Sequence, residues 1–196
     1  MMKRTIMGMF ALAMLSAGCA RGPAQPKAYA LKEVPDEFSA QVAAAEAAFT
    51  TLQQRLLARL SEEMGRGGPV GAIDVCRNEA QTITDAVEKD QGVVMGRTSH
   101  RVRNPGNAPR EWVRPYVDAA AGKKAGEVEG VAVDLGDRVG VLRPIPTGAP
   151  CMQCHGSSES MMPEVQEAIR AAYPDDRATG FSAGDLRGFF WAEVKK

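Results

Sequence analysis

The stretch EVEGVAVDLGDRVGVLRPI, residues 127–145, decides the fold, because two strand-like runs flank a turn. Residues 127–133 and residues 138–145 are apolar and rich in β-branched side chains. Between them stands Leu135-Gly136-Asp137, a combination that favours a tight turn. The stretch therefore predicts a β-hairpin, and with it an antiparallel sheet.

Two helices are predicted before this hairpin. The first is indicated by apolar residues at helical spacing: Phe38, Val42, Ala45, Phe49, Leu52, Leu56 and Leu60. Asp36 is a plausible cap for its start, and Gly65-Arg66-Gly67-Gly68-Pro69 should end it. A second helix is predicted from Val70 to about Glu88, with an apolar stripe formed by Ile73, Cys76, Ala80, Ile83 and Val87.

The remaining elements alternate between strand and helix. Residues 93–97 and 186–194 favour strands, whereas residues 111–121 and 163–173 favour short helices. Helices followed by a mixed antiparallel arrangement indicate a single α+β domain. Trp112, Tyr116, Phe189, Phe190 and Trp191 are predicted to fill its core.

The composition excludes several classes of protein. The 196 residues include 24 basic and 24 acidic side chains, so net charge gives no reason to expect a nucleic-acid partner. Charged residues at 24% and apolar residues at 44% are typical of a globular chain. No interior stretch suits a polytopic membrane protein. Four cysteines are too few for a disulfide scaffold of this length, so each cysteine needs its own explanation.

The N-terminus resembles a bacterial lipoprotein signal. Lys3 and Arg4 precede an apolar run that ends at Leu15-Ser16-Ala17-Gly18-Cys19. We expect a signal peptide over residues 1–18, a lipidated Cys19, a tether over residues 19–35 and one domain over residues 36–196. The alternative is ordinary cleavage near Ala20, which would discard Cys19.

This prediction places the protein in the periplasm, attached to a membrane through its lipid anchor. Removal of Lys3 and Arg4 with the signal leaves 22 basic and 24 acidic side chains in the mature chain. In an exported protein, paired thiols oxidise unless a metal or a cofactor holds them. The remaining cysteines must therefore be explained by such chemistry.

Cys151-Met152-Gln153-Cys154-His155 has the spacing that covalent haem attachment requires. Two thiols can add across the porphyrin vinyl groups, and the histidine that follows supplies the proximal ligand of the iron. The alternatives are a disulfide, a redox-active dithiol or half of a zinc site. No second paired motif is present to complete a zinc site, and the motif lies in a Pro- and Gly-rich loop, so one haem c is predicted.

The sixth ligand of the iron is less well defined by the sequence. Four methionines outside the motif and the signal are candidates: Met64, Met95, Met161 and Met162. His100 is expected at the polar surface. Cys76 lies in the apolar stripe of the second predicted helix, so its position suits a core side chain and an iron ligand equally.

Haem propionates need cationic partners, and arginine suits them best. Four arginines are near the loops expected to border haem, although each is predicted to be a solvated surface residue: Arg97, Arg101, Arg103 and Arg143. Asn104 and Asn107 are expected to hold turns. The sequence contains no catalytic triad or phosphate loop, so we expect no enzyme.

Beyond the haem motif, three segments resemble a known family. They are Ala72-Ile73-Asp74-Val75-Cys76, then Gly96-Arg97-Thr98-Ser99 leading into Arg103-Asn104-Pro105-Gly106-Asn107-Ala108-Pro109, and finally the motif with Gly156. The chain resembles, over residues 40–194, the PAS-like c-type haem family. The resemblance implies helices flanking an antiparallel sheet, and an iron held by His155 and Cys76.

Two functions are consistent with this reading. One is electron transfer at low potential, because a thiolate ligand stabilises ferric iron; the other is sensing of redox state or of a diatomic gas. The resemblance favours sensing, and either function needs a redox or signalling protein partner. The alternatives are an electron-transfer cytochrome c with a methionine sixth ligand, and a peroxidase-like haem enzyme that uses His100.

Overall fold

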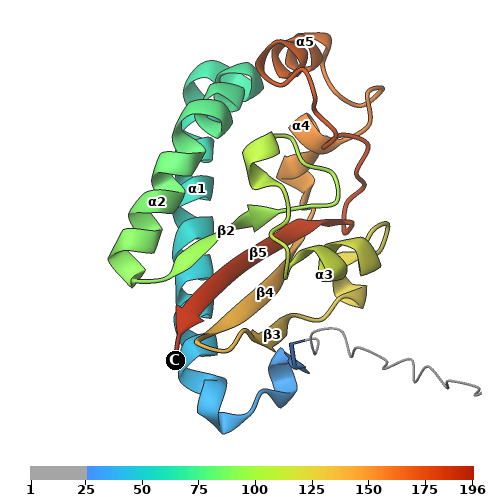
Figure 1. The fold of residues 1–196 in the computed structure, drawn as a ribbon. Helices are drawn as coiled ribbons and strands as arrows, with labels where there is room; N and C mark the ends of the chain where they lie inside the picture. The colour runs from blue at the N-terminus through green and yellow to red at the C-terminus, as the bar shows by residue number, and fades with distance from the viewer. Residues whose placement is uncertain (1–25) are drawn as a thin grey trace, which may run out of the picture.

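The fold is α+β, as the sequence predicts. The computed structural model describes residues 26–196, so the expected signal peptide and Cys19 lie outside the described residues. Five strands form one antiparallel sheet in the order β1-β3-β4-β5-β2 (Figure 1). Their bounds are Ala28–Ala30 for β1, Val94–Thr98 for β2, Val131–Asp134 for β3, Arg138–Pro146 for β4 and Leu186–Lys195 for β5.

The predicted hairpin is confirmed. Strands β3 and β4 pair from Val131 opposite Leu142 to Asp134 opposite Val139. Strand β5 lies between β4 and β2, so the last strand of the chain is central in the sheet. Between β4 and β5 the chain leaves the sheet for residues 147–185, and Thr147 and Gly184–Asp185 close this excursion through two backbone hydrogen bonds.

Two long helices cover one face of the sheet. Helix α1 (Ser39–Asp74) contains a break at Gly68, whose φ of 64° is the left-handed conformation that glycine accommodates. Helix α2 (Ala80–Gln91) follows after one π-helical turn, η3 (Val75–Glu79). The core on this face joins both helices to β4 and β5 and includes Phe49, Leu52, Val87, Val141 and Phe190. The predicted helix break near residues 65–69 is therefore confirmed.

The opposite face is covered by α3 (Arg114–Ala119) and the loops around it. Val113 and Val117 pack there against Leu142 of β4 and Phe189 and Trp191 of β5. The short helix predicted over residues 111–121 is therefore confirmed, but it spans only Arg114–Ala119. Because both faces of the sheet are covered, β4 and β5 form the centre of the molecule.

A third apolar cluster lies beyond the end of the sheet. It joins the last turns of α1 to α5 (Pro163–Ala172) through Ile73, Met161, Val165, Ile169 and Tyr173. Cys154 packs against this cluster. The haem motif of the sequence is therefore tied to the end of α1.

The ordered fold begins before residue 36. Ala28–Ala30, inside the segment expected to be a tether, pairs with Val131–Val133 as the edge strand β1. Two 3-10 turns follow, η1 (Leu31–Glu33) and η2 (Asp36–Phe38). Along residues 26–196, no helix combines the length and the apolar character needed to cross a membrane.

Candidate functional site

The Cys-x-x-Cys-His motif folds as a short helical turn. Cys151 ends the 3-10 turn η6 (Ala149–Cys151), and α4 (Met152–His155) continues it. A separation of three residues on a helix places Cys151 and Cys154 on the same side. Both thiols are partly exposed and free, so no disulfide joins them.

Gly156 closes the motif tightly. A Cβ atom at this position would lie 2.6 Å from the Met152 carbonyl oxygen and 2.7 Å from Ser160 Oγ. Both distances are shorter than real contacts allow, so the position needs glycine. The backbone of Gly156 then accepts a hydrogen bond from Gly180 N at 2.7 Å, which brings residues 178–181 alongside the motif.

The His155 ring has a defined orientation. Its Nδ1 lies 2.6 Å from the Ala178 carbonyl oxygen, so Nδ1 carries the proton and donates it. Phe181 lies edge-on to the ring, at 6.3 Å between centroids. This arrangement leaves Nε2 as the nitrogen with a free lone pair, which is the form of histidine that binds a metal.

The surroundings keep His155 neutral. Burial, and then the positive charges of Arg187 and Arg103, lower the pKa of the imidazole to about 3. The hydrogen bond to Ala178 opposes this shift only in part. A neutral imidazole is a competent iron ligand, whereas a protonated one is not.

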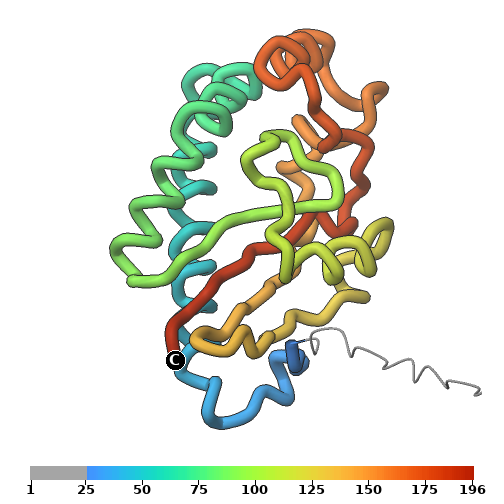
Figure 2. Tube along the Cα trace, in the orientation of Figure 1, coloured from blue at the N-terminus to red at the C-terminus, as the bar shows by residue number. Residues whose placement is uncertain are grey.

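Arg103 is not a solvated surface residue, contrary to the sequence prediction. Its side chain is 9% exposed and forms an ion pair with Asp176, whose side chain is 8% exposed. Nη2 of Arg103 also donates to the Cys154 carbonyl oxygen at 2.6 Å. Figure 2 shows the segment that carries Arg103 crossing in front of the sheet beside the segment that carries Asp176, and Arg177 N donates to Val102 O between them.

Cys76 lies on the π-helical turn η3. Such turns are rare and occur often at functional sites, because they redirect a side chain without ending the helix. The turn is flanked by Arg59 of α1, which binds both carboxylate oxygens of Glu79 at 2.8 Å and Glu63 at 3.1 Å. A second pair, Arg55 with Asp90, joins α1 to α2 at 2.9 Å farther along.

The Cys76 thiol is accessible to solvent, which differs from the core-facing position that the sequence stripe indicates. Burial by surrounding protein nevertheless raises the pKa of the thiol, while the charges of Arg97, Arg103 and Arg187 act in the opposite direction. The Cys76 thiol is therefore open to solvent on one side and bordered by protein on the other. Two of these arginines, Arg103 and Arg187, also act on His155, so the structure brings Cys76 and the motif into one electrostatic environment.

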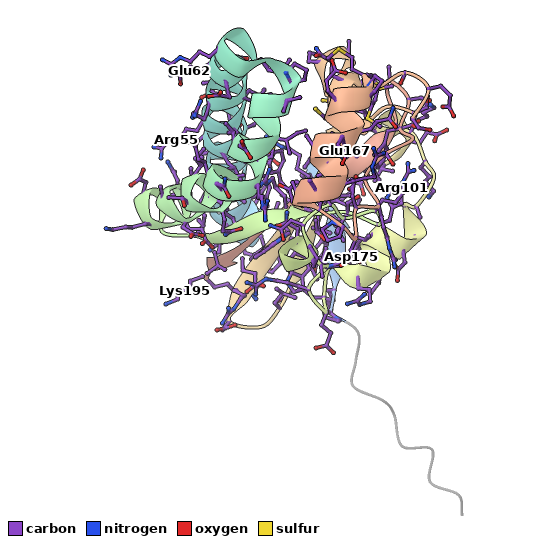
Figure 3. All side chains as sticks on the ribbon, turned by 90° about the horizontal axis from the view of Figure 1, so that it is seen from above. Arg55, Glu62, Arg101, Glu167, Asp175 and Lys195 are labelled. Carbon is purple, nitrogen blue, oxygen red and sulfur yellow. The ribbon has the colours of Figure 1, made fainter. Side chains whose placement is uncertain are left out.

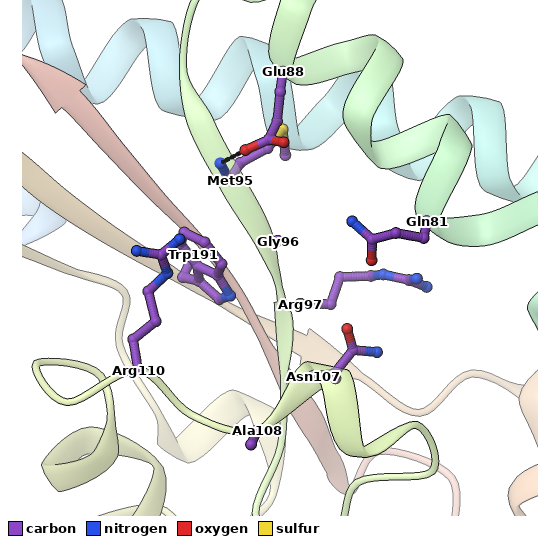
Figure 4. Close-up of a pocket in the computed structure, with 10 residues that line it drawn as sticks. Gln81, Glu88, Met95, Gly96, Arg97, Asn107, Ala108, Arg110 and Trp191 are labelled. Carbon is purple, nitrogen blue, oxygen red and sulfur yellow. Dashed lines mark hydrogen bonds between the residues drawn. The ribbon is translucent and has the colours of Figure 1, made fainter.

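Arg97 is also partly buried rather than fully solvated. Burial lowers the pKa of its guanidinium, while the neighbouring Cys76 and Tyr173 act in the opposite direction. Figure 4 shows Arg97 extending from β2 toward the side of Gln81 and Asn107, at a hollow of about 250 Å³. Among the residues drawn there, the hydrogen bond marked is that from Met95 N to Glu88, and Arg97 forms none.

Arg187 is a site residue that the sequence analysis missed. Burial, followed by the charges of Arg103 and Arg97, lowers the pKa of its guanidinium to about 10. Its side chain donates only a long 3.4 Å hydrogen bond, to the Arg101 carbonyl oxygen. The charges of Arg97, Arg103 and Arg187 thus act on the Cys76 thiol, and Asp176 opposes the shift in the pKa of Arg187.

His100 is only partly exposed, which corrects the prediction of a surface position. Its ring lies edge-on to Phe181 at 6.0 Å, so the Phe181 ring contacts both histidines. Burial and the charges of Arg101 and Arg187 lower the pKa of His100. Arg101 itself stacks over Phe181 at 3.8 Å and donates to the Thr179 carbonyl oxygen, so it is also not a free surface cation.

The other sequence candidates are spread over the fold. Arg143 binds Glu46, Thr50 and Gln53 of α1, and so fastens α1 to the sheet. Seen from above, Arg101 lies beside α5, on the side of the molecule away from Arg55 of α1 (Figure 3). Of the methionines, Met95 and Met161 are buried in separate apolar clusters, Met64 is partly buried and Met162 is exposed.

No cluster of three or more His, Cys, Asp or Glu side chains is placed to hold a metal ion directly within residues 26–196. The two thiols, the oriented imidazole and the nearby arginines instead match the chemistry of a covalently attached haem. Asp176, the Ala178 carbonyl, Phe181 and Arg187 complete this arrangement. No spacing in the sequence links these residues to the motif, because the fold alone brings them together.

Three comparisons with known proteins bear on this arrangement. A family model described as "Tll0287-like: Tll0287" matches residues 23–194. A solved structure, that of the cyanobacterial heme-protein Tll0287, superposes with a TM-score of 0.56 and 23% sequence identity, covering 83% of this chain and 98% of that one. At this identity the likeness shows a shared fold. No curated protein matches the sequence.

Proposed function

The chain belongs to the Tll0287-like family, and from this membership we propose that it is an exported protein that binds one covalently attached haem. A solved protein with this fold is described as a heme-protein, and the resemblance to PAS-like c-type haem proteins belongs to the same proposal. The observation that carries it is the neutral, oriented His155 beside two free thiols at the required spacing.

In the proposed site, Cys151 and Cys154 form thioethers and Nε2 of His155 is the proximal ligand. Cys76 is the proposed sixth ligand, because its thiol shares Arg103 and Arg187 with His155. Arg97 and Arg187 are the proposed partners of the propionates, since neither guanidinium has a carboxylate bonded to it among the described residues. Bound haem supplies an iron that accepts and returns one electron.

We propose that the protein acts in redox or gas sensing, with low-potential electron transfer as the second candidate. Sensing is favoured by the accessibility of Cys76 and by its place on a π-helical turn, since a sixth ligand that can leave opens a position on the iron. A thiolate ligand should lower the reduction potential in either case. A redox or signalling protein is the proposed partner.

The proposed role is not enzymatic. A peroxidase-like reaction needs a proton-handling group at the open position of the iron. His100 is the side chain suggested for that task, but it contacts Phe181, which also contacts His155. The other alternative is a methionine as the sixth ligand. The candidate for it is Met161, a buried residue of the apolar cluster against which Cys154 packs.

The test is spectroscopy of the full chain, produced together with cytochrome c maturation machinery. We expect covalent haem and a ferric spectrum with thiolate character that is lost in Cys76→Ala. Carbon monoxide binding to the ferrous form would favour sensing, and indifference to it would favour electron transfer. Failure to incorporate haem would overturn the proposal, and an unchanged spectrum in Cys76→Ala would overturn the sixth ligand.

Membrane attachment through a lipid on Cys19 is part of the same proposal. The full chain should incorporate labelled fatty acid and sediment with membranes, and Cys19→Ser should lose both properties. Release of an unlabelled, soluble wild-type protein would instead support ordinary cleavage near Ala20.

A further inference from the structure

The turn that begins at Arg103 has no part in the function proposed above. Asn104 caps it by accepting a hydrogen bond from Gly106 N at 2.9 Å, and Thr98 Oγ1 donates to the Asn107 carbonyl oxygen at 2.8 Å. These bonds fix the turn on the end of β2. Arg103 is therefore held at a defined place in front of the haem motif.

From that place, one guanidinium bonds to three residues in two other segments of the chain. Arg103 Nε and Nη2 donate to the two carboxylate oxygens of Asp176, each at 3.1 Å. Nη2 also donates to the Cys154 carbonyl oxygen at 2.6 Å and, more weakly, to the Ala178 carbonyl oxygen at 3.4 Å. Both partners of the ion pair are more than nine-tenths buried.

Asp176 extends this arrangement to the histidine. Its Oδ1 accepts a hydrogen bond from Ala178 N at 2.9 Å, so the carboxylate fixes the peptide group that precedes Ala178. The Ala178 carbonyl oxygen is the acceptor for His155 Nδ1. Phe181 N donates to the His155 carbonyl oxygen at 2.9 Å, which holds the two segments side by side in antiparallel directions.

We infer that Arg103 and Asp176 are positioning residues for His155: their ion pair fixes the Cys154 and Ala178 carbonyl groups, and thereby sets the plane of the imidazole and the basicity of its Nε2. The inference rests on the proposed function for its consequence at the iron. The acceptor of Nδ1–H determines how strongly a histidine donates to a metal. A buried arginine with a bidentate carboxylate partner is well suited to hold that acceptor.

Arg103→Lys is the decisive variant, because it keeps the positive charge and removes the bidentate fork. In the ferrous holoprotein we expect the His155 Nδ1 proton to exchange with solvent about tenfold faster than in the wild type. The ring resonances of His155 in the ferric form and the midpoint potential should both shift. A role in stability alone would leave the ring resonances and the midpoint potential unchanged.

Glu193→Gln supplies the matched control. Glu193 is also a buried carboxylate, with a side chain 7% exposed, and it bonds to Arg110 and Arg138 on the other face of the sheet. This variant should lower the melting temperature and leave the His155 signals unchanged. If Arg103→Lys behaved in the same way as Glu193→Gln, the inference would be overturned.

Asp176→Asn tests the same inference if the Arg103→Lys variant does not fold. An asparagine side chain keeps an oxygen acceptor for Ala178 N–H while it removes the charge partner of Arg103. We expect accelerated exchange of the Nδ1 proton and a midpoint potential that rises, because an uncompensated positive charge favours ferrous iron. Wild-type exchange and potential in this variant would overturn the inference.

Failure of the proposed function gives a different result. If the wild-type chain takes up no haem, the proposed function is wrong, whereas the Nδ1 proton can still be measured in the haem-free protein. Faster exchange in Arg103→Lys than in Glu193→Gln would then support the positioning role by itself. Equal exchange in the two variants would overturn it.

Discussion

The two sides of the candidate haem site are built differently. His155 stands on a turn that the buried Arg103–Asp176 pair, the Ala178 carbonyl and Gly156 hold at several points. Cys76 stands on a single π-helical turn, beside which the pair between Arg59 and Glu79 is partly exposed, with side chains 27% and 42% accessible. Exposed ion pairs contribute little to stability, whereas breaking a buried pair is costly.

In the proposed haem site, this difference would combine a permanent ligand, His155, with an exchangeable one, Cys76. A side chain fixed by buried bonds would stay in place when the charge of the iron changes. A side chain on an accessible turn can move at small cost, because few contacts must break. Substitutions on the His155 side and on the Cys76 side, made separately, test whether the two sides differ in rigidity.

The largest difference is expected between His155→Ala and Cys76→Ala in the haem-free chain. Loss of the imidazole removes the short hydrogen bond to the Ala178 carbonyl and leaves a cavity, and should lower the free energy of unfolding by about 2 kcal/mol. Loss of the accessible Cys76 thiol should change it by less than about 0.5 kcal/mol. Denaturant titration of both variants measures the difference.

If His155→Ala and Cys76→Ala destabilised the chain equally, the two sides of the site would not differ in how firmly they are held. Gln153→Ala serves as the control on the motif, because its side chain is exposed and forms no part of the bonded network described above. Its unfolding should match that of the wild type.

Hydrogen exchange gives a second test, without substitution on either side. Amide protons of residues 75–79 should exchange about tenfold faster than those of Phe181 and Gly180, which bond across to the motif. The matched reference is the helical backbone of α2, which continues η3 in regular geometry. Slower exchange in η3 than in the segment 178–181 would show that the cysteine side is the rigid one.

A smaller effect is expected from the arginines near Cys76. The charge of Arg97 opposes the rise that burial causes in the pKa of the thiol. In a Cys151→Ser/Cys154→Ser background, Arg97→Gln should therefore raise that pKa further and slow alkylation of Cys76 at pH 8 by a few-fold. Arg77→Gln is the control, because Arg77 adjoins Cys76 in sequence but is not among the charges that act on the thiol.

The smallest expected effect concerns the exposed pairs of α1. Arg59→Gln should destabilise the haem-free chain slightly, because it releases both Glu79 and Glu63, and it should increase exchange within residues 75–79. Arg55→Gln breaks one single-contact pair between the same helices and should cost less. Exchange that rises equally in both variants would mean that Arg59 has no specific role beside η3.

Much of the fold was predictable, because local patterns dominate it. The hairpin followed from β-branched runs around Gly136, and the break in α1 from Gly68-Pro69. The start of the fold was not predictable, because the strand β1 has only three residues and is stabilised by its pairing with β3, which no local pattern indicates. Helical periodicity placed Cys76 toward the core, and the π-helical turn changed that direction.

The candidate site was predictable only where its residues are neighbours in sequence. The Cys151–His155 spacing indicates its chemistry by itself. The roles of Arg103, Asp176 and Arg187 depend on three segments that meet only in the folded chain. The sequence therefore indicated arginines near the site, but it misjudged all four of them as solvated, because a charged residue is usually at the surface: Arg97, Arg101, Arg103 and Arg143.

The excursion of residues 147–185 between β4 and β5 has a consequence for how such a protein can diversify. Its two ends meet at adjacent central strands, with Pro146 opposite Leu186, so the sheet is complete without the interior of the excursion. The entropy of closing such a segment grows only slowly with its length. Insertions and deletions should therefore be tolerated at the exposed turn of residues 158–159, but not in the buried part of the excursion that contains Val165 and Asp176, while the sheet keeps its register.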